Sequence, residues 1–264
     1  MKRHILFLLI LTIGLCLHVP VAHSQYFKFE NLDDQAIEQE VDAILKFFGS
    51  LVGGGLYHTA DLHSVGGIDV GLRGIVANIP EDVKSLSAFS EEDLVGLAFL
   101  HGSFGLPGNF ELFGRFFYFP IGSDADLNAS PPRAADSRGG VTLIGGGLKY
   151  GVLQLPGLPK VMVMGTYHAV LVPDEFDFGT VSTVSFNGVA SYSVPIFTLY
   201  AGGGIDISSL RLNDEFLNGD RITESEPHLT LGAQIKPFPL VHANASYNVS
   251  EFNSFDLGIG ISFR

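Results

Sequence analysis

The sequence predicts an all-β protein, a transmembrane antiparallel β-barrel of about ten strands preceded by an amphipathic helix. Glycine is frequent, at 32 of 264 residues, and only 16% of residues are charged, against about a quarter in an ordinary soluble domain. Apolar and polar side chains alternate along many segments, most regularly over 254–263. This period of two predicts strands with one apolar and one polar face. In lipid such a sheet must close on itself, because an open edge cannot be hydrated there.

We predict a secretory signal peptide over residues 1–24. Its basic residues, at 2 and 3, precede an apolar run over 5–17, and a small-residue cleavage site follows at 22–24. Cys16, the one cysteine of the chain, lies within that run, so the mature protein is expected to contain no disulfide. Removal of the two basic residues takes the net charge from −13 to −15. This acidic balance argues against nucleic-acid binding, which needs a basic surface.

Residues 25–66 are predicted to cap or plug the barrel, with a helix over 31–51. Asp33 and Asp34 suit the start of a helix, where carboxylates meet unpaired amides and the positive end of the dipole. Glycines at 53–55 end it. The apolar positions at helical spacing are Ile37, Val41, Ile44, Leu45 and Phe48. A helix of this length is marginal in water, so we expect it to bury this stripe across the barrel mouth or inside the lumen.

Residues 67–264 are predicted to form the barrel. The strand candidates are 67–77, 95–106, 109–119, 140–153, 160–172, 180–194, 196–209, 228–236, 241–249 and 254–263. Several exceed the roughly 5–6 residues of globular strands and approach the ~9–11 that a tilted strand needs to cross a bilayer. Long and short connections alternate, as in barrels with one end at the cell exterior and the other at the periplasm. We expect the last strand to end on the periplasmic side and to close the barrel by pairing with 67–77.

The alternation also predicts which polar side chains face the lumen. The main candidates are Asp69, Arg73, Glu111, Arg115, Lys149, His168, Asp206, Lys236, His242 and Asp256, and the wider set adds Asn187, Gln234, Asn244 and Asn248. One interpretation is a network of ion pairs that fills a narrow barrel, since buried charges must be paired. The other is a polar conduit. A ten-stranded barrel is only slightly wider than the eight-stranded barrel that side chains fill, which favours a filled or gated lumen over an open pore.

The sequence shows two resemblances to known proteins. The last strand resembles the assembly signal of bacterial outer-membrane barrels, carried here by Asp256, Gly258, Ile261 and Phe263, which implies recognition by the barrel-assembly machinery. Residues 53–70, 110–115 and 145–159 resemble an uncharacterised outer-membrane β-barrel family of Bacteroidetes-like bacteria, itself distantly like long-chain fatty-acid channel barrels. The resemblance implies a Gram-negative outer membrane and contact with its lipid. It implies no activity.

We predict no enzyme activity, no cofactor and no bound metal. His58 and His63 are close in sequence, but their spacing matches no strong metal motif, and a turn leading into the first strand is the simpler interpretation. The acid and histidine groups nearest a barrel rim are His168 with Asp174 and Asp177, and His228 with Glu226. No nucleophile motif accompanies either group.

The leading functional hypothesis is porin-like transport, the passive or gated passage of a small solute, including a hydrophobic one. It follows from a polar lumen combined with a plug-like helix. The alternative is a non-transporting surface or scaffold barrel that binds a partner through the acidic loops at 80–94 and 212–226. The sequence identifies neither the solute nor a soluble partner.

Overall fold

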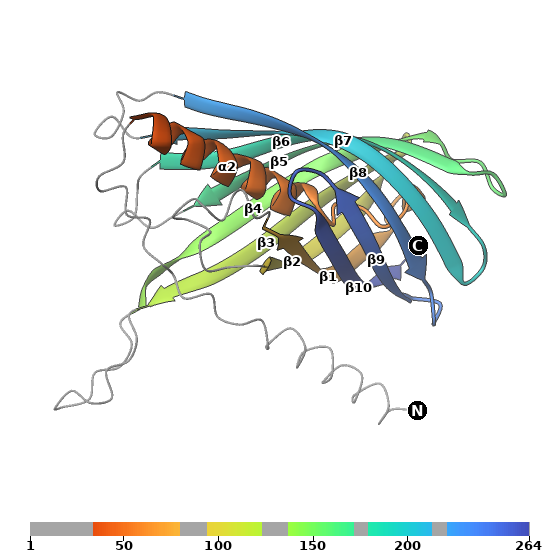
Figure 1. Cartoon of the computed structure of the whole chain (residues 1–264). Coiled ribbons are helices and arrows are strands. Elements are labelled where there is room, and N and C mark those ends of the chain that lie inside the picture. The colour runs from red at the N-terminus through yellow and green to blue at the C-terminus, as the bar shows by residue number, and fades with distance from the viewer. Residues whose placement is uncertain (1–33, 80–93, 123–136, 172–178, 213–220, 264) are drawn as a thin grey trace, which may run out of the picture.

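The computed structural model describes residues 34–79, 94–122, 137–171, 179–212 and 221–263. The predicted signal peptide lies outside these residues. Within them the chain forms one helix and ten strands (Figure 1). The elements are α2 (Asp34–Gly53), β1 (Ile68–Asn78), β2 (Leu94–Leu106), β3 (Phe110–Gly122), β4 (Ser137–Leu153), β5 (Lys160–Leu171), β6 (Gly179–Ser193), β7 (Phe197–Leu212), β8 (Arg221–Ile235), β9 (Val241–Val249) and β10 (Ser254–Phe263).

The strands form a closed barrel in which each strand pairs antiparallel with its neighbours in the sequence, and β1 pairs with β10. The seam between the first and last strands runs in continuous register from Ile68 opposite Phe263 to Ala77 opposite Ser254. The predicted fold class and the predicted closing pair are therefore confirmed.

The barrel exposes apolar side chains on its outside and buries polar ones inside. On β10, Phe255, Leu257 and Phe263 are 46–55% exposed, whereas the intervening Asp256 is 1% exposed. Other strands follow the same pattern, with Leu231 on β8 66% exposed. This arrangement is the reverse of a soluble barrel, and an outer surface of this kind suits contact with lipid.

The two ends of the barrel differ in their connections. We call the end with the connections at 107–109, 154–159, 194–196 and 236–240 the short-turn end. The opposite end joins strands through 79–93, 123–136, 172–178, 213–220 and 250–253, and we call it the long-loop end. Most of the connecting residues at the long-loop end, including much of both acidic loops, lie outside the described part of the chain.

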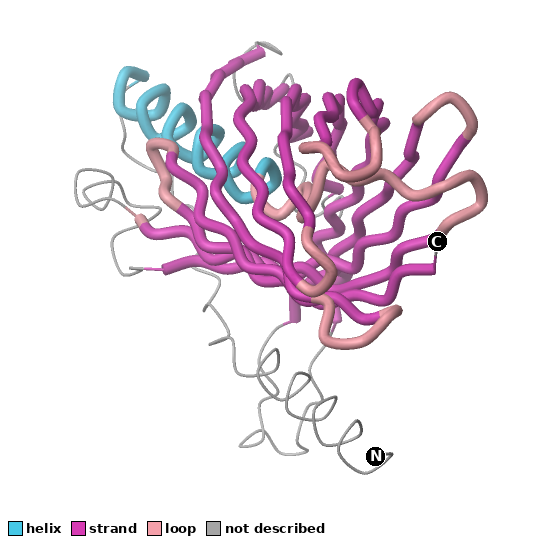
Figure 2. The backbone as a smooth tube through the Cα atoms, turned by 90° about the vertical axis from the view of Figure 1, so that its right-hand side faces the viewer, coloured by secondary structure: helices cyan, strands magenta, loops and turns pink. Residues whose placement is uncertain are grey.

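The helix α2 lies at the long-loop end, and residues 54–67 lead from it to the start of β1 at the short-turn end (Figures 1 and 2). We call residues 34–67 the plug segment. Every residue from Gly49 to Ala60 is buried, which places the second half of the helix and the start of the connector inside the lumen and not across its mouth. Among the described residues no helix is long and apolar enough to span a bilayer.

The lumen is apolar around the helix, which the alternation did not predict. Phe47, Leu51 and Val52 of α2 pack into a buried cluster with wall residues that include Phe99 and Leu143. The ring of Phe47 meets that of Phe252 edge-on at 5.3 Å between centroids. In the predicted stripe, Leu45 is buried and Phe48 is half-buried. Burial extends beyond the stripe because the surrounding wall contacts the helix on several sides.

The main error in the predicted boundaries concerns β8, which begins at Arg221 and not at 228. Its first half pairs with β7 up to Arg211 opposite Arg221, and Pro227 lies within the ladder opposite Ile205. Proline cannot donate to the ladder, so Pro227 favours a strand that begins after it. Polar residues on both faces of this half also removed the alternation, and Arg221, Thr223 and Ser225 are exposed on its outer face. The other ends differ by up to three residues.

Candidate functional site

The lumen candidates lie where the plug segment contacts the wall. Asp69, Arg73, Glu111, Arg115, Lys149, His168, Asp206, His242 and Asp256 are all buried on the inward faces of their strands. Lys236 lies one residue beyond β8 and is half-buried at the short-turn end. The wider set of Asn187, Gln234, Asn244 and Asn248 is buried as well. The side chains on strands come from nine of the ten strands and form several contact groups.

Asp256 holds the middle of the plug segment. Its Oδ2 accepts hydrogen bonds from the backbone N–H of Gly55 at 2.7 Å, from Asn248 at 2.8 Å and from Ser246 at 3.0 Å. Gly55 has a φ of +58°, in the left-handed region that follows a helix end. The residue predicted as part of the assembly signal therefore also binds the plug segment through the backbone.

Arg115 binds the end of the helix. Its guanidinium donates to the carbonyl oxygen of Val52 at 3.0 Å and lies over the ring of Phe99, with 4.1 Å from Cζ to the ring centroid. A cation at this position satisfies a helix carbonyl and complements the negative end of the dipole. At the long-loop end, Lys46 pairs with Glu251 at 3.2 Å. Burial opposes the charge on Lys46, but the hydrogen bond and the charge of Glu251 outweigh it, so its pKa is raised.

Glu111 is a second buried carboxylate that accepts three hydrogen bonds. Its Oε1 accepts from Lys149 at 2.7 Å, and its Oε2 accepts from the backbone N–H and the Nδ1 of His63 at 2.9 and 2.7 Å. The other ring nitrogen of His63, Nε2, lies 2.7 Å from Ser262 Oγ. One carboxylate thus joins the plug segment to β3, β4 and, through His63, to β10.

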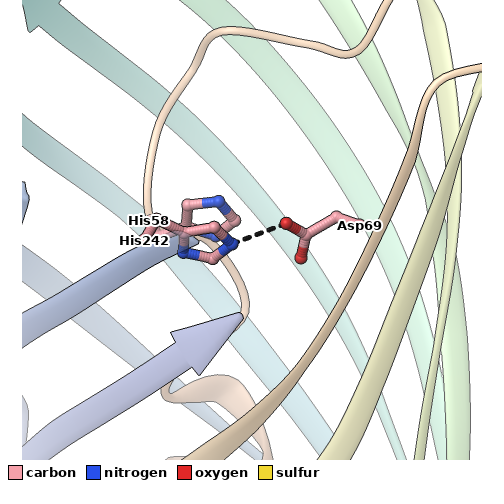
Figure 3. Close-up of side chains that lie close together, drawn as sticks. All are labelled: His58, Asp69 and His242. Atoms are coloured by element: carbon pink, nitrogen blue, oxygen red, sulfur yellow. Dashed lines mark hydrogen bonds and ion pairs between the residues drawn. The ribbon is translucent and has the colours of Figure 1, made fainter. Parts of the chain in front are cut away.

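His58, Asp69 and His242 form the second polar group near the short-turn end (Figure 3). The two imidazole rings stack at 4.5 Å between centroids, and His242 Nε2 lies 2.6 Å from Asp69 Oδ2. Arg73 donates to His58 Nδ1 at 2.7 Å, and it also bonds Asn244. Since arginine only donates, the proton of neutral His58 is on Nε2.

These three residues offer ligand atoms within 4.8 Å of one another, which raises the question of a metal. A zinc ion needs nitrogen and oxygen atoms that converge at about 2.0–2.2 Å. Here Arg73 occupies the Nδ1 lone pair of His58 and brings a positive charge, and the second ring is parallel to the first. The group suits a hydrogen-bonded network better than a cation. The absence of a metal stays a prediction.

A cleft of about 260 Å³ opens next to this group at the short-turn end. Its lining includes His58, His242, Lys236, Leu240 and Ser262. A larger groove of about 720 Å³ lies on the outer wall, lined mainly by apolar residues and glycines of β1 to β5. Only the smaller cleft reaches the contacts between the plug segment and the wall.

The sequence missed several residues of this interface. His63 belongs to a segment without periodicity, so nothing indicated which strand it would contact. Ser262 lies on the polar face of the last strand, and that position was the one available signal. Thr59 and Ser191 form a further contact, 3.2 Å between hydroxyl oxygens. Of the rim groups, Asp174 and Asp177 lie outside the described residues, and His228 contacts Asp206 at 2.8 Å.

A protein family described as a family of unknown function, DUF6588, matches residues 86–263. The chain belongs to the DUF6588 family. The match covers β2 to β10, whereas the plug segment and β1 precede it. A comparison with curated proteins gave no match. The predicted origin in Bacteroidetes-like bacteria and the predicted likeness to fatty-acid channels stay predictions.

Solved structures similar to this DUF6588 barrel include outer-membrane proteins. Ail of Yersinia pestis, in complex with a heparin analogue, is 14% identical and covers 75% of this chain and 99% of its own, with a TM-score of 0.30. The N-terminal barrel of OprF from Pseudomonas aeruginosa is 11% identical, covers 76% and 98%, and scores 0.33. OmpT of Vibrio cholerae is 14% identical, covers 76% and 62%, and scores 0.34. Likenesses this distant carry no argument about function.

Proposed function

We propose that this DUF6588 protein is a gated channel of the Gram-negative outer membrane, closed by its plug segment and opened when that segment moves. The apolar outer surface supports the membrane location, because tens of exposed aliphatic and aromatic side chains would be unfavourable in water. The long-loop end would face the cell exterior, following the usual arrangement of such barrels.

The observation that carries the proposal is the nature of the contacts between the plug segment and the wall. Leu56, Tyr57 and Ala60 pack in a buried apolar cluster with wall residues that include Phe113. The polar contacts from Gly55 to His63 include hydrogen bonds to Asp256, Ser191 and Glu111. Water and the polar groups of a solute can replace these hydrogen bonds. Each one adds a net free energy of about 0.5–1.5 kcal/mol, or about 1.5–3 kcal/mol where a carboxylate accepts. Covalent continuity with β1 keeps a displaced plug segment close to the barrel.

The apolar cluster around α2 supports passage of a solute with a hydrophobic part. Withdrawal of the helix would uncover Phe99, Leu143 and Ile75 on the inner wall at the long-loop end, while Glu111 and Lys149 remain on the polar wall. A conduit with an apolar stretch followed by a polar one suits small amphipathic molecules better than ions alone.

A reversible lock tests the proposal. Thr59→Cys with Ser191→Cys replaces two oxygens that are 3.2 Å apart, and a disulfide between these positions would fix the plug segment to β6. We expect channel openings in planar bilayers for the wild type, none for the oxidised double variant, and recovery after reduction. Deletion of residues 34–66 should give persistent conductance.

The matched control is Thr183→Cys with Ser208→Cys, which joins β6 to β7 within the wall at 2.8 Å between oxygens. It should leave the openings unchanged in either redox state. Openings that persist in the locked protein would contradict gating by the plug segment. A folded deletion variant that does not conduct would favour the alternative, a non-transporting scaffold barrel, for which the filled lumen is the supporting observation.

A further inference from the structure

Three side chains near the short-turn end form a hydrogen-bonded series whose outer member, Ser262, has no part in the proposed channel. Ser262 Oγ lies 2.7 Å from His63 Nε2, and His63 Nδ1 lies 2.7 Å from Glu111 Oε2. They come from β10, the plug segment and β3. His63 and Glu111 are buried, whereas Ser262 is half-buried and lines the cleft of about 260 Å³.

The hydrogen-bonding roles in this series follow from its ends. The Glu111 carboxylate is paired with Lys149 and can only accept, so His63 Nδ1 carries the proton. In the neutral ring, Nε2 is then the acceptor, and the Ser262 hydroxyl donates to it. A serine that donates to a histidine whose other nitrogen is held by a carboxylate is an activated nucleophile.

The cleft that Ser262 lines also contains groups that could bind a reacting ester. Leu240 and Val241 give it an apolar part, and Lys236 and His58 bring N–H donors. His58 carries its proton on Nε2, because Arg73 donates to Nδ1. N–H donors near a nucleophile stabilise the oxyanion that forms in acyl transfer. The volume is at the lower limit of ligand pockets, roughly 300–1,000 Å³, which favours short acyl groups.

We propose that Ser262 and His63 hydrolyse short acyl esters that enter the cleft from the short-turn end, with Glu111 as the residue that positions His63. This inference is independent of the proposed channel. It departs from the expectation of no enzyme activity, which rested on the lack of a nucleophile motif. No motif was available, because the three residues come from separate parts of the chain.

The reaction balances with water as the only co-reactant. Ser262 Oγ forms a bond to the carbonyl carbon while its proton moves to His63 Nε2. The bond from that carbon to the alcohol oxygen then breaks, and the alcohol leaves with the proton from His63. Water attacks the acyl-serine with the same help from His63, which releases the carboxylic acid and restores the Ser262 hydroxyl. Glu111 remains ionised and stabilises the protonated imidazole.

The test uses the complete mature protein folded in detergent micelles, a fluorophosphonate probe and p-nitrophenyl butyrate. We expect the probe to label Ser262, located by peptide mass spectrometry, and the ester to be hydrolysed. Ser262→Ala should abolish both. Loss of the base in His63→Gly should lower kcat/KM by at least about 100-fold, and added imidazole should restore part of the rate, which a purely structural histidine would not show. Glu111→Gln should lower kcat more than it raises KM.

The matched control is Ser193→Ala, which removes an exposed hydroxyl near the same end that bonds Thr198 and no histidine. It should be labelled and active like the wild type. Heat-dependent gel mobility identifies the folded fraction of each variant, and rates are compared for that fraction alone. Folded wild-type protein that is not labelled at Ser262, or hydrolysis that survives in folded Ser262→Ala, would overturn the proposal.

Discussion

Replacing Glu111 with glutamine is expected to lower the free energy of unfolding by about 3–5 kcal/mol, the cost of breaking a buried ion pair by removing one partner. The side chains of Lys149 and Glu111 are 4% and 3% exposed, so the ammonium of Lys149 would remain buried without a counterion. The uncharged amide would also bind the two N–H groups of His63 more weakly. Urea unfolding in lipid vesicles, followed by circular dichroism, measures the change.

The double variant Glu111→Gln with Lys149→Met distinguishes two costs. One is the loss of the ion pair itself, and the other is the burial of an unpaired Lys149 ammonium. Methionine has a similar length and no charge, so the double variant should recover a large part of the lost stability. The matched surface control is Glu251→Gln. The side chains of Glu251 and of its partner Lys46 are 48% and 29% exposed, so this substitution should lower the free energy of unfolding by less than about 1 kcal/mol. If Glu111→Gln lowers the free energy of unfolding by as little as Glu251→Gln does, the Glu111 contacts do not stabilise the barrel.

If the protein is the gated channel proposed above, replacing Gly202 with valine is expected to open it by displacing the plug segment. Gly202 lies on the inner face of β7, where a Cβ atom would lie 2.5 Å from the hydroxyl oxygen of Tyr57 and 2.8 Å from its Cζ. Overpacking costs about 1–3 kcal/mol. Because this cost destabilises only the state in which the plug segment is seated, it raises the ratio of displaced to seated protein by about 5–150-fold. The measurement is the open probability in planar bilayers.

The control for this change is Gly188→Val on β6. Gly188 lies on the outer face, and a Cβ there meets no atom within 4 Å, so the same substitution should leave the open probability unchanged. A variant that combines Gly202→Val with Thr59→Cys and Ser191→Cys should show no openings when its disulfide is formed. A Gly202→Val protein that folds and opens no more often than Gly188→Val would count against displacement of the plug segment as the gating step.

The sequence was sufficient for the barrel and its closure because both depend on local periodicity. The segment from Ser254 to Phe263 alternates without interruption, and its inward and outward sets agree with the structure. The start of β8 could not be found in this way, because alternation is absent where both faces of a strand are polar. The position of α2 was open for a different reason. A helical stripe shows that one face is buried but not which surface buries it.

For the candidate site, the sequence predicted which single side chains face the lumen but not which of them contact one another. The inward direction of Glu111, Lys149 and Asp256 followed from strand parity, but their partners depend on strand register and on a segment without periodicity. Ser262 and His63 are in contact although their sequence numbers differ by 199 in a chain of 264 residues. The apolar part of the lumen was not predicted, because Phe113 and Phe117 on β3 interrupt the polar face. Phe117 packs against the cluster around α2, and Phe113 packs with Leu56 and Tyr57 of the connector.

The position of Asp256 also constrains the order in which the molecule can be assembled. The plug segment runs through the lumen from the long-loop end to the short-turn end, and the wall closes around it at the seam between β1 and β10. The carboxylate that binds Gly55 belongs to β10, the tenth strand of the barrel in chain order. The plug segment therefore cannot acquire this contact until the final strand arrives, so closing the seam and seating the plug are coupled steps.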